Sequence, residues 1–306
     1  MTQNETVADW RADTQQVANR IRVRVLDHVL RNNGGYMSQA LSSAEVFAML
    51  YTRVLNLGPS TAPMIPRPFA GVPGPDNPDF FNGGDYNGPK GADYDRFIFS
   101  PAHYALVLYT ALIEVGRMAE EGLEQFNMDG TTVEMIGAEH SPGVETTTGS
   151  LAQALSQAAG IALARKLRGD RGDVWVMMSD GEFQEGQIWE AIGEAAKFEL
   201  DNLKVIVDVN GQQCDGCINA DIYVDPLTNR IRAFGASAVE VDGHDLDALD
   251  AAMSADTGKP HFVIALTNPA RGLPIFEERA PLLHYLRFTS KEERDRYRAV
   301  YEEMVN

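Results

Sequence analysis

The stretch VMMSDGEFQEGQIWEA, residues 176–191, places an acid and a glycine directly behind an apolar run. The preceding residues, DVWVMM, predict a buried strand, and the residues from Glu182 onward predict a helix. Asp180 therefore stands at the carboxyl end of a strand just where a helix begins, which is the crevice in which open α/β sheets bind ligands. The free N–H groups of a helix start attract phosphate, whereas a carboxylate repels it unless a cation lies between them. The stretch therefore predicts a metal-bound diphosphate.

The rest of the sequence alternates between strand and helix patterns. Four short apolar runs predict further strands, at 96–100, 204–209, 236–242 and 261–267. Two helices are predicted before the first of these strands, one over residues 9–33 and one that starts with a capping box at Ser42 and Glu45. Strands that alternate with helices indicate an α/β fold with a doubly wound, mainly parallel sheet and helices on both faces. We expect residues 1–306 to form one domain.

Residues 58–92 are dense in proline, glycine and asparagine. A stretch of this length without regular structure is either functional or disordered. Its aromatic side chains favour a packed loop: Phe69, Phe80, Phe81 and Tyr86. We expect this loop to be an insertion that serves as a lid or as a contact between subunits.

Charge and composition exclude several classes of partner. The 306-residue sequence has a formal net charge of −18, which argues against nucleic acid or an anionic membrane as a partner. No apolar run approaches the length of a membrane span. The first residues lack the basic region and apolar core of a signal peptide, so a cytoplasmic location is expected.

Cys214 and Cys217 are the only cysteines, and their spacing raises the question of a redox or zinc site. A zinc site would need two further ligands, and there is no second cysteine pair. A thioredoxin-like motif would open a helix, whereas GQQCDGC predicts a turn. The sequence therefore favours neither, and two cysteines without a disulfide framework fit a reducing compartment.

Asn210 ends the next predicted strand, about one strand–helix–strand unit after Asp180. If the connection is right-handed and the strands are neighbours, both side chains reach the same crevice. A carboxylate, an amide oxygen and a backbone carbonyl are hard ligands, and Mg²⁺ completes such a set with phosphate oxygens. Because both residue types are common in turns, the pair alone leaves an ordinary turn open.

Four segments resemble motifs of the transketolase family and occur in the family's order. They are DRFIFSPAHYALVLYTAL, GVETTTGSLAQALSQAAGIALA, SDGEFQEGQIWEA…VDVNGQQCDG and ARGLPIFEERAPLLHY. The third resembles the thiamine-diphosphate motif, and the match covers only the first, diphosphate-binding region of a full-length transketolase. The resemblance implies the N-terminal subunit of a split transketolase that binds thiamine diphosphate.

The resemblance assigns cofactor contacts residue by residue. Asp180, Asn210 and the carbonyl of Gln212 match the ligands of Mg²⁺, or of Ca²⁺ or Mn²⁺ in its place. Gly181 matches the position whose N–H meets the diphosphate. Cys214 lies where the family usually has an aliphatic residue beside the cofactor, which supports a small hydrophobic role.

Five further positions match residues near the cofactor rings and the substrate. Gly149 and Leu151 match the loop that touches the rings, and Glu185 matches a glutamate that couples the two active sites. His103 and His284 match histidines that face the substrate and move protons. All of these except Leu151 have a plain structural alternative: a helix-start glycine, a solvated helix charge, or a histidine buried in packing.

The sequence also departs from the family pattern. The histidine of the family's S-G-H-P-G segment is missing from NNGGYMS, where Tyr36 or Gln39 could stand in. His140 is a candidate substitute for a second missing histidine, and Arg271 replaces a lysine. These changes leave the cofactor chemistry intact but put ordinary sugar-phosphate specificity in doubt, which leaves room for a modified or branched sugar.

The family keeps the glutamate that activates the cofactor in a second α/β domain, which the residues after 267 are too few to form. We therefore expect that glutamate on a partner subunit, an α2β2 assembly, and no activity for this chain alone. The implied reaction is transfer of a two-carbon ketol unit between small sugars, by a transferase of class EC 2.2.1. Other thiamine enzymes (2-oxoacid decarboxylases, dehydrogenases and acyloin-forming carboligases), a non-catalytic scaffold and a magnesium phosphohydrolase stay as alternatives.

Overall fold

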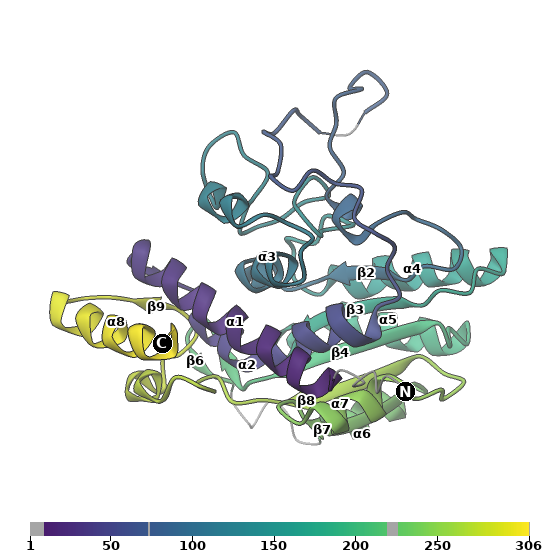
Figure 1. The fold of residues 1–306 in the computed structure, drawn as a ribbon. Coiled ribbons are helices and arrows are strands. Elements are labelled where there is room, and N and C mark those ends of the chain that lie inside the picture. The colour runs from purple at the N-terminus through teal and green to yellow at the C-terminus, as the bar shows by residue number, and fades with distance from the viewer. Residues whose placement is uncertain (1–8, 73, 219–225, 306) are drawn as a thin grey trace, which may run out of the picture.

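A five-stranded sheet forms the centre of the computed structural model, which describes residues 9–72, 74–218 and 226–305 (Figure 1). The strand order is β2-β3-β4-β8-β7, and every neighbouring pair is parallel. The strands are β2 Arg96–Phe99, β3 Val174–Ser179, β4 Leu203–Val209, β7 Ser237–Asp242 and β8 His261–Leu266. Each lies within two residues of a predicted strand, so the predicted doubly wound sheet is confirmed.

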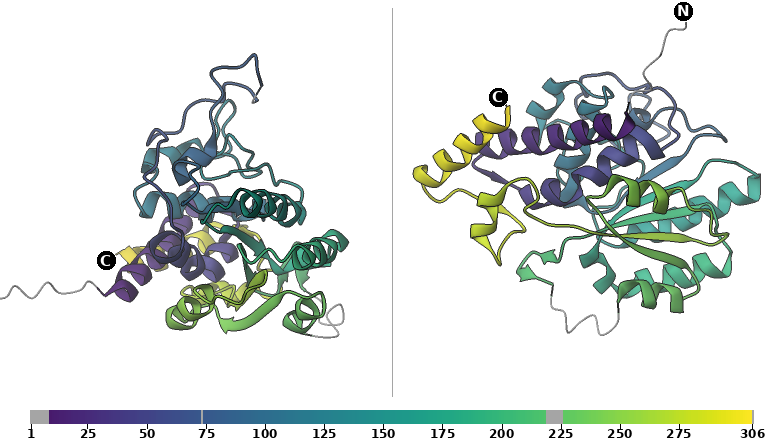
Figure 2. Two further views of the ribbon diagram at one scale, coloured as in Figure 1. Left: turned by 90° about the vertical axis from the view of Figure 1, so that its right-hand side faces the viewer. Right: turned by 60° about the horizontal axis from the view of Figure 1, so that its bottom comes forward.

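Helices cover both faces of this sheet (Figures 1 and 2). On one face, α1, α2, α3 and α7 share a core with Trp175 and Met177 of β3. On the other, α4, α5 and α6 pack on Val174, Val176 and Met178 of the same strand. The alternation follows from the two-residue period of a strand that is buried on both sides. The helices are α1 Trp10–Arg31, α2 Met37–Met49, α3 Ala105–Glu114, α4 Gln153–Arg168, α5 Gly186–Lys197, α6 Leu227–Ala233, α7 Leu246–Met253 and α8 Lys291–Val305.

The predicted start of the second helix is wrong. Helix α2 begins at Met37, and Ser42 and Glu45 lie inside it rather than forming a capping box. Ser42 donates a 2.6 Å hydrogen bond to Asp208 of β4, and Glu45 forms a buried ion pair with Arg22 of α1. Polar side chains that resemble a cap are used here for contacts between elements. A π-helical turn, η1 Leu50–Val54, then ends this segment.

The helix expected directly after Asp180 also starts later than predicted. A 3-10 turn, η5 Asp180–Gln184, follows β3, and α5 begins only at Gly186. The extended backbone of Glu185 separates the two. Other short 3-10 helices are η3 Ala102–Tyr104, η4 Glu120–Gln125 and η7 Pro274–Arg279.

Two short antiparallel pairs lie outside the central sheet. Strand β1, Gly34–Gly35, pairs with β9, Leu286–Arg287, and β5, Gln212–Gln213, pairs with β6, Gly216–Cys217. A Cβ at Gly34 would lie 2.7 Å from the carbonyl oxygen of Leu286, so only glycine allows the close approach of β1 and β9. The residues after α1 are thereby fixed beside those before α8.

The segment 58–92 has no regular structure among its described residues except one 3-10 helix, η2 Gly83–Asn87. It stands above the sheet in Figure 1 and in the left panel of Figure 2. Tyr86 is fully buried, and the N–H of Phe69 bonds the carbonyl of Gly130 across 2.9 Å. The part of the loop around Phe81 and Tyr86 is therefore packed, as predicted, whereas Phe69 is 41% exposed; the role of the loop as a lid or subunit contact stays a prediction. Within the described ranges, no helix combines the length and apolar character needed to cross a membrane.

Candidate functional site

Asp180 and Asn210 follow neighbouring parallel strands, as the sequence predicts. In the register of β3 and β4, Ser179 lies beside Asp208, so both turns leave the sheet at the same level. The N–H of Gly211 donates to Oδ2 of Asp180 over 2.8 Å, and the N–H of Gly181 donates to Oδ1 over 2.9 Å. The two turns therefore form one hydrogen-bonded unit at the carboxyl edge of the sheet.

The amide of Asn210 has a fixed orientation. Its Nδ2 donates to Asp208, Ser42 and Tyr104 at 3.0–3.2 Å, and its Oδ1 accepts from the N–H of Gln212 at 2.9 Å. Because the three acceptors lie on the Nδ2 side, the amide oxygen must point toward the turn that follows β4. That orientation presents an oxygen, rather than a nitrogen, on the side of Gln212.

Asp208 is a site residue that the sequence analysis missed. It is fully buried, and its carboxylate accepts hydrogen bonds from four side chains: Ser42, Tyr104, Asn210 and Thr267. Burial raises the pKa of Asp208, and these hydrogen bonds act in the opposite direction. An acid inside the apolar run VIVDV was the available signal, because such a residue is buried only when its oxygens are satisfied.

The polar atoms around Asp180 suit a hard cation. Burial, reinforced by the charge of Asp208, raises the pKa of Asp180 to about 7. Oε1 of Gln212 is buried and has no hydrogen-bond partner, and the space in front of Gly181 is open enough for a Cβ to meet nothing within 4 Å. Among the described residues, no group of three or more His, Cys, Asp or Glu side chains could hold a metal. A cation here would therefore depend on the carboxylate of Asp180 together with an amide oxygen, a backbone carbonyl and phosphate oxygens.

Glu182 holds the loop that contains Gly149 and Leu151, and the sequence analysis did not assign it a role. Its buried carboxylate accepts from the N–H of Ala152 at 2.9 Å and from the N–H of Ser179 at 2.8 Å. Ala152 has a φ of 71°, a conformation that is unfavourable for alanine and that this hydrogen bond stabilises. Leu151 is 40% exposed beside it, so the loop presents an apolar side chain at the edge of the sheet.

The structure brings His103 and His284 together. Their ring centroids are 5.0 Å apart, and the ring of Tyr36 lies 5.8 Å from the first and 5.5 Å from the second. Nε2 of Gln39 lies 3.3 Å from the carbonyl oxygen of His284 and 3.4 Å from its Nδ1. Both suggested stand-ins therefore reach this cluster. His140 instead has its described contacts with Phe69 and Glu134, outside the predicted site.

Both histidines of this pair are held neutral. Burial, with the neighbouring His284, lowers the pKa of His103 to about 3. Burial also lowers the pKa of His284. A neutral imidazole has one donor and one acceptor nitrogen, so each ring can both give and accept a hydrogen bond.

The remaining predicted residues lie at the rim of the same edge. Glu185 is exposed at the start of α5. Cys214 is an exposed free thiol in the turn of the β5–β6 hairpin, which the hydrogen bond between Gln213 and Gln184 links to η5 at 2.8 Å. Burial and the nearby Cys214 raise the pKa of Tyr36, which places this turn beside the histidine cluster.

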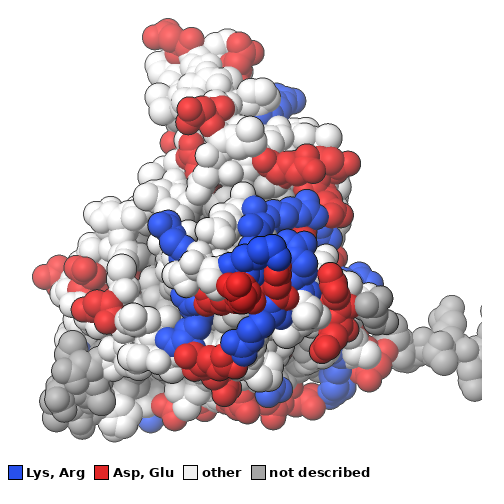
Figure 3. Space-filling model, turned by 90° about the vertical axis from the view of Figure 1, so that its left-hand side faces the viewer, with Lys and Arg blue, Asp and Glu red and all other residues white. Residues whose placement is uncertain are grey.

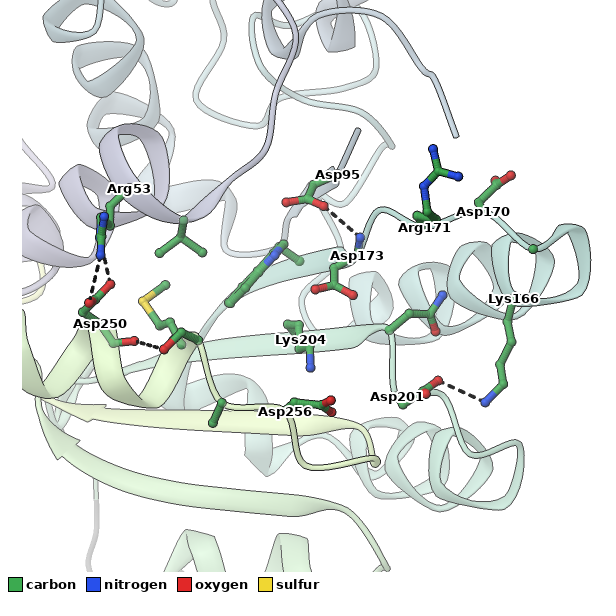
Figure 4. Close-up of a pocket in the computed structure, with 17 residues that line it drawn as sticks. Arg53, Asp95, Lys166, Asp170, Arg171, Asp173, Asp201, Lys204, Asp250 and Asp256 are labelled. Atoms are coloured by element: carbon green, nitrogen blue, oxygen red, sulfur yellow. Dashed lines mark hydrogen bonds and ion pairs between the residues drawn. The ribbon is translucent and has the colours of Figure 1, made fainter. Parts of the chain in front are cut away.

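A second feature, a cavity of about 720 Å³, lies at the opposite edge of the sheet (Figure 4). It includes residues at the starts of β2, β3 and β4, among them Asp95, Asp173 and Lys204, and none of the predicted site residues. Its Arg53 pairs with Asp250, and its Lys166 pairs with Asp201. The 720 Å³ cavity and the predicted site residues therefore lie at opposite edges of the sheet.

Charges gather on only part of the face where β6 and β9 lie in Figure 1 (Figure 3). Lysine and arginine are mixed there with aspartate and glutamate, next to uncharged surface. In and around α8, ion pairs join residues of opposite sign: Arg296 with Glu278, Lys291 with Asp295, and Arg279 with Glu293. The face has no purely basic patch of the kind that binds a polyanion.

The chain resembles known proteins over most of its length. Residues 81–280 match the family model described as "Transketolase, thiamine diphosphate binding domain". The chain is 35% identical over 278 residues to "Putative uncharacterized transketolase family protein y4mO" of Sinorhizobium fredii, covering 88% of this chain and 90% of that protein. It is 31% identical to an apulose-4-phosphate transketolase subunit of Actinobacillus succinogenes, covering 89% of this chain and 90% of that protein.

Larger relatives match only in part. "Transketolase-like protein 2" of Homo sapiens is 31% identical over 86% of this chain, which spans 38% of that protein. The solved transketolase of Campylobacter jejuni superimposes with a TM-score of 0.68 at 21% identity, over 96% of this chain and 47% of that one. The likeness to that structure shows the shared α/β fold, and the chain spans less than half the length of both proteins.

Proposed function

Because the chain belongs to the transketolase family, we propose that it is the cofactor-binding subunit of a two-chain transketolase. The observation that carries this proposal is the unit formed by Asp180, Gly211 and Asn210, which places two oxygen-bearing side chains at the ends of adjacent strands. Two relatives of similar length support the division into subunits, since their names describe transketolase subunits.

The chain holds magnesium and the diphosphate of the cofactor at this unit. Asp180, the amide oxygen of Asn210 and the backbone carbonyl of Gln212 bind Mg²⁺, and phosphate oxygens complete its coordination. The raised pKa of Asp180 supports this assignment, because a buried carboxylate gains most from a cation. The N–H of Gly181, which donates to Oδ1 of Asp180 in this structure, would contact the diphosphate of the bound cofactor, and a Cβ at Gly181 would meet nothing within 4 Å.

The loop of Gly149 and Leu151 would contact the rings of the cofactor, and Cys214 would lie beside the cofactor. When bound, thiamine diphosphate supplies the carbanion chemistry that breaks and forms the carbon–carbon bond. The exposure of Leu151 supports this contact, because an apolar side chain at a polar edge gains by being covered. Glu185, exposed at the start of α5, couples this site with its counterpart in the assembly.

His103 and His284 bind substrate oxygens and transfer protons. The 5.0 Å separation of their rings allows one small polar molecule to contact both. Because burial keeps both rings neutral, each has one nitrogen that can accept a hydrogen bond and one that can donate a hydrogen bond. The reaction is transfer of a two-carbon ketol unit from a ketose to an aldose.

A separate subunit completes the active site. Two relatives, which this chain covers to 90% and 95% of their length, are named as transketolase subunits, and these names support a second polypeptide. That partner provides the glutamate that activates the cofactor, in an α2β2 assembly. The chain alone is inactive.

Titration calorimetry of thiamine diphosphate with Mg²⁺ tests the proposal, on this chain alone and mixed with a C-terminal transketolase subunit from the same genome. We expect tight binding that needs magnesium, the partner and Asp180. Asp180→Ala abolishes it, whereas Asp256→Ala, at the opposite edge of the sheet, leaves it unchanged. Absence of binding with every mixture would overturn the proposal.

Donor specificity is the second part of this test. The mixed enzyme is supplied with a ketose or with a 2-oxoacid, together with an aldose acceptor. Ketol transfer from the ketose supports the transketolase assignment. Turnover of the 2-oxoacid alone would place the chain among other thiamine enzymes.

A further inference from the structure

A cavity of about 380 Å³ adjoins the histidine cluster. Tyr36 and His103, whose rings both lie near His284, also line this cavity. Its other walls come from the last turn of α1, the β1 turn, the start of α3 and residues 126–128 and 135, with Tyr285 at the side. A substrate held by the two histidines therefore has space to extend behind them.

The lining of this cavity is uncharged. None of the described residues that line it is Lys, Arg, Asp or Glu. Burial lowers the pKa of His28 to about 4, so this ring, like that of His103, is neutral near pH 7. Near the cavity, Arg31 lies 2.5 Å from Asp27, and the guanidinium of Arg287 lies 5.8 Å from the centre of the Tyr285 ring. An anionic group inside the cavity would lose water without meeting a charged side chain in the lining.

The lining nevertheless offers hydrogen bonds beside apolar surface. The hydroxyls of Tyr36 and Tyr285 have no hydrogen bond to other described residues, and Asn127 uses its Oδ1 for the N–H of Met135 while its Nδ2 stays available. Between them lie apolar side chains, Leu106, Phe126, Met128 and Met135. A few polar groups set in an apolar wall fix the orientation of a ligand that carries hydroxyls on a carbon chain.

We infer that this cavity binds an uncharged, hydroxyl-bearing part of the substrate, a polyol chain or a hydroxymethyl branch, and that any phosphate or other anionic group of the substrate lies outside it. The inference rests on the proposed function, in which His103 and His284 face the sugar. Beyond that function, the inference specifies which part of the sugar the chain recognises and which residues recognise it.

Two cavity-filling variants test the inference, in the complex with the partner subunit. Met135→Trp and Met128→Trp add bulk to the lining of the cavity. Met135 is half-buried and Met128 is exposed, so neither substitution disrupts the core. Leu167→Trp is the control, because Leu167 is 80% exposed near the end of α4 and does not line the cavity. Binding of ribitol, a neutral five-carbon polyol, is measured by saturation-transfer NMR, and kcat/KM is measured with D-ribose and with glycolaldehyde as acceptors.

We expect both fillers to weaken ribitol binding and to lower kcat/KM for ribose by at least about tenfold, a typical effect of changing the fit of a pocket. Glycolaldehyde has two carbons and does not reach the cavity, so its kcat/KM changes by less than about twofold, and the control behaves as wild type. Equal losses for both acceptors, or ribitol binding that survives in both fillers, would overturn the inference. Loss of subunit association in the fillers would also overturn it, because the cavity would then belong to the partner contact.

The outcomes separate this inference from the proposed function. If the wild-type complex binds ribitol in a filler-sensitive way but transfers no ketol unit, the cavity assignment stands and the proposed function fails. If ketol transfer occurs and the fillers affect both acceptors alike, the proposed function stands and the cavity assignment fails.

Discussion

Gly211 donates its backbone N–H to the carboxylate of Asp180 across 2.8 Å, and so joins the turn after β4 to the turn after β3. The contact makes the two strand ends one structural unit, so that a displacement of either turn moves both predicted metal ligands. Asp208 lies beside Ser179 in the sheet and accepts a hydrogen bond from the amide of Asn210. It therefore supports this unit from within the sheet.

Replacement of Asp208 tests that support. Asp208→Asn puts an amide where four donors require an acceptor, so one donor loses its partner. We expect a loss of about 2 kcal/mol in the free energy of unfolding and a fall of about 10–100-fold in magnesium affinity. Urea unfolding and magnesium titration with the cofactor measure the two effects. Thr267→Val, which removes a single donor, serves as the milder control; an unchanged magnesium affinity in Asp208→Asn would show that Asp208 does not position Asn210.

Glu182 is expected to control the loop that faces the cofactor rings. In Glu182→Gln the N–H of Ala152 meets a weaker acceptor, and the unfavourable φ of 71° at Ala152 loses its main restraint. We predict a loss of about 1–3 kcal/mol in stability and faster hydrogen exchange at the Ala152 amide. Glu190→Gln, on the exposed side of α5, is the matched control. Unchanged exchange at Ala152 would remove Glu182 from this role.

The neutral state of His103 predicts a pH dependence of stability. Its pKa is about 3 in the folded chain, against 6.5 for an ordinary histidine, so the unfolded state binds the proton first as the pH falls. The contribution of His103 to stability is therefore complete above pH 6.5 and is lost progressively below it. Between pH 7.5 and 5.5 we expect a loss of about 1.4 kcal/mol from this residue.

Urea unfolding at both pH values measures this effect in wild type and in His103→Gln. The variant should lose less stability than wild type over that interval, whereas His140→Gln, which removes a histidine elsewhere, serves as the comparison. Identical pH dependence in wild type and His103→Gln would contradict the assignment.

The buried pair between Arg22 and Glu45 predicts a large effect on stability. Although burial raises the pKa of Glu45, hydrogen bonds from His244 and Arg22 hold it at about 2. Arg22→Met leaves this carboxylate buried with only His244 and the amide of Gln15 as hydrogen-bond partners, and we expect a cost of about 3 kcal/mol in the free energy of unfolding. Arg296→Met breaks an ion pair whose partners are 55% and 58% exposed, and should cost less than about 1 kcal/mol by the same denaturation assay. Similar costs for the two would be inconsistent with a buried network.

The sheet was predictable because its signal is local. The strands 174–179 and 203–209 are apolar except for Ser179, Lys204 and Asp208, and their length and β-branched content identify them without knowledge of the tertiary structure. Asp180 and Asn210 could be placed together for the same reason, since adjacent parallel strands end at the same edge.

The parts that the sequence did not predict depend on contacts between distant residues. The local sequence around Ser42 predicts a helix cap. In the structure its hydroxyl instead donates a hydrogen bond to Asp208, and helix α2 has already begun at Met37. Glu182 lies within the predicted helix, and only the fold shows that it reaches back to Ala152. The proximity of Tyr36 to His284 depends on the two-residue pairing of β1 with β9, which is too short to leave a periodic pattern.

The pairing of β1 with β9 also determines when the histidine cluster can first form during synthesis on the ribosome. The five strands of the sheet are all present once residue 266 has emerged, so the turns of Asp180 and Asn210 can form then. Gly34 and Gly35 obtain their partners only after Leu286 and Arg287 have followed. A nascent chain interrupted between these points would hold a finished sheet edge and an unassembled histidine cluster.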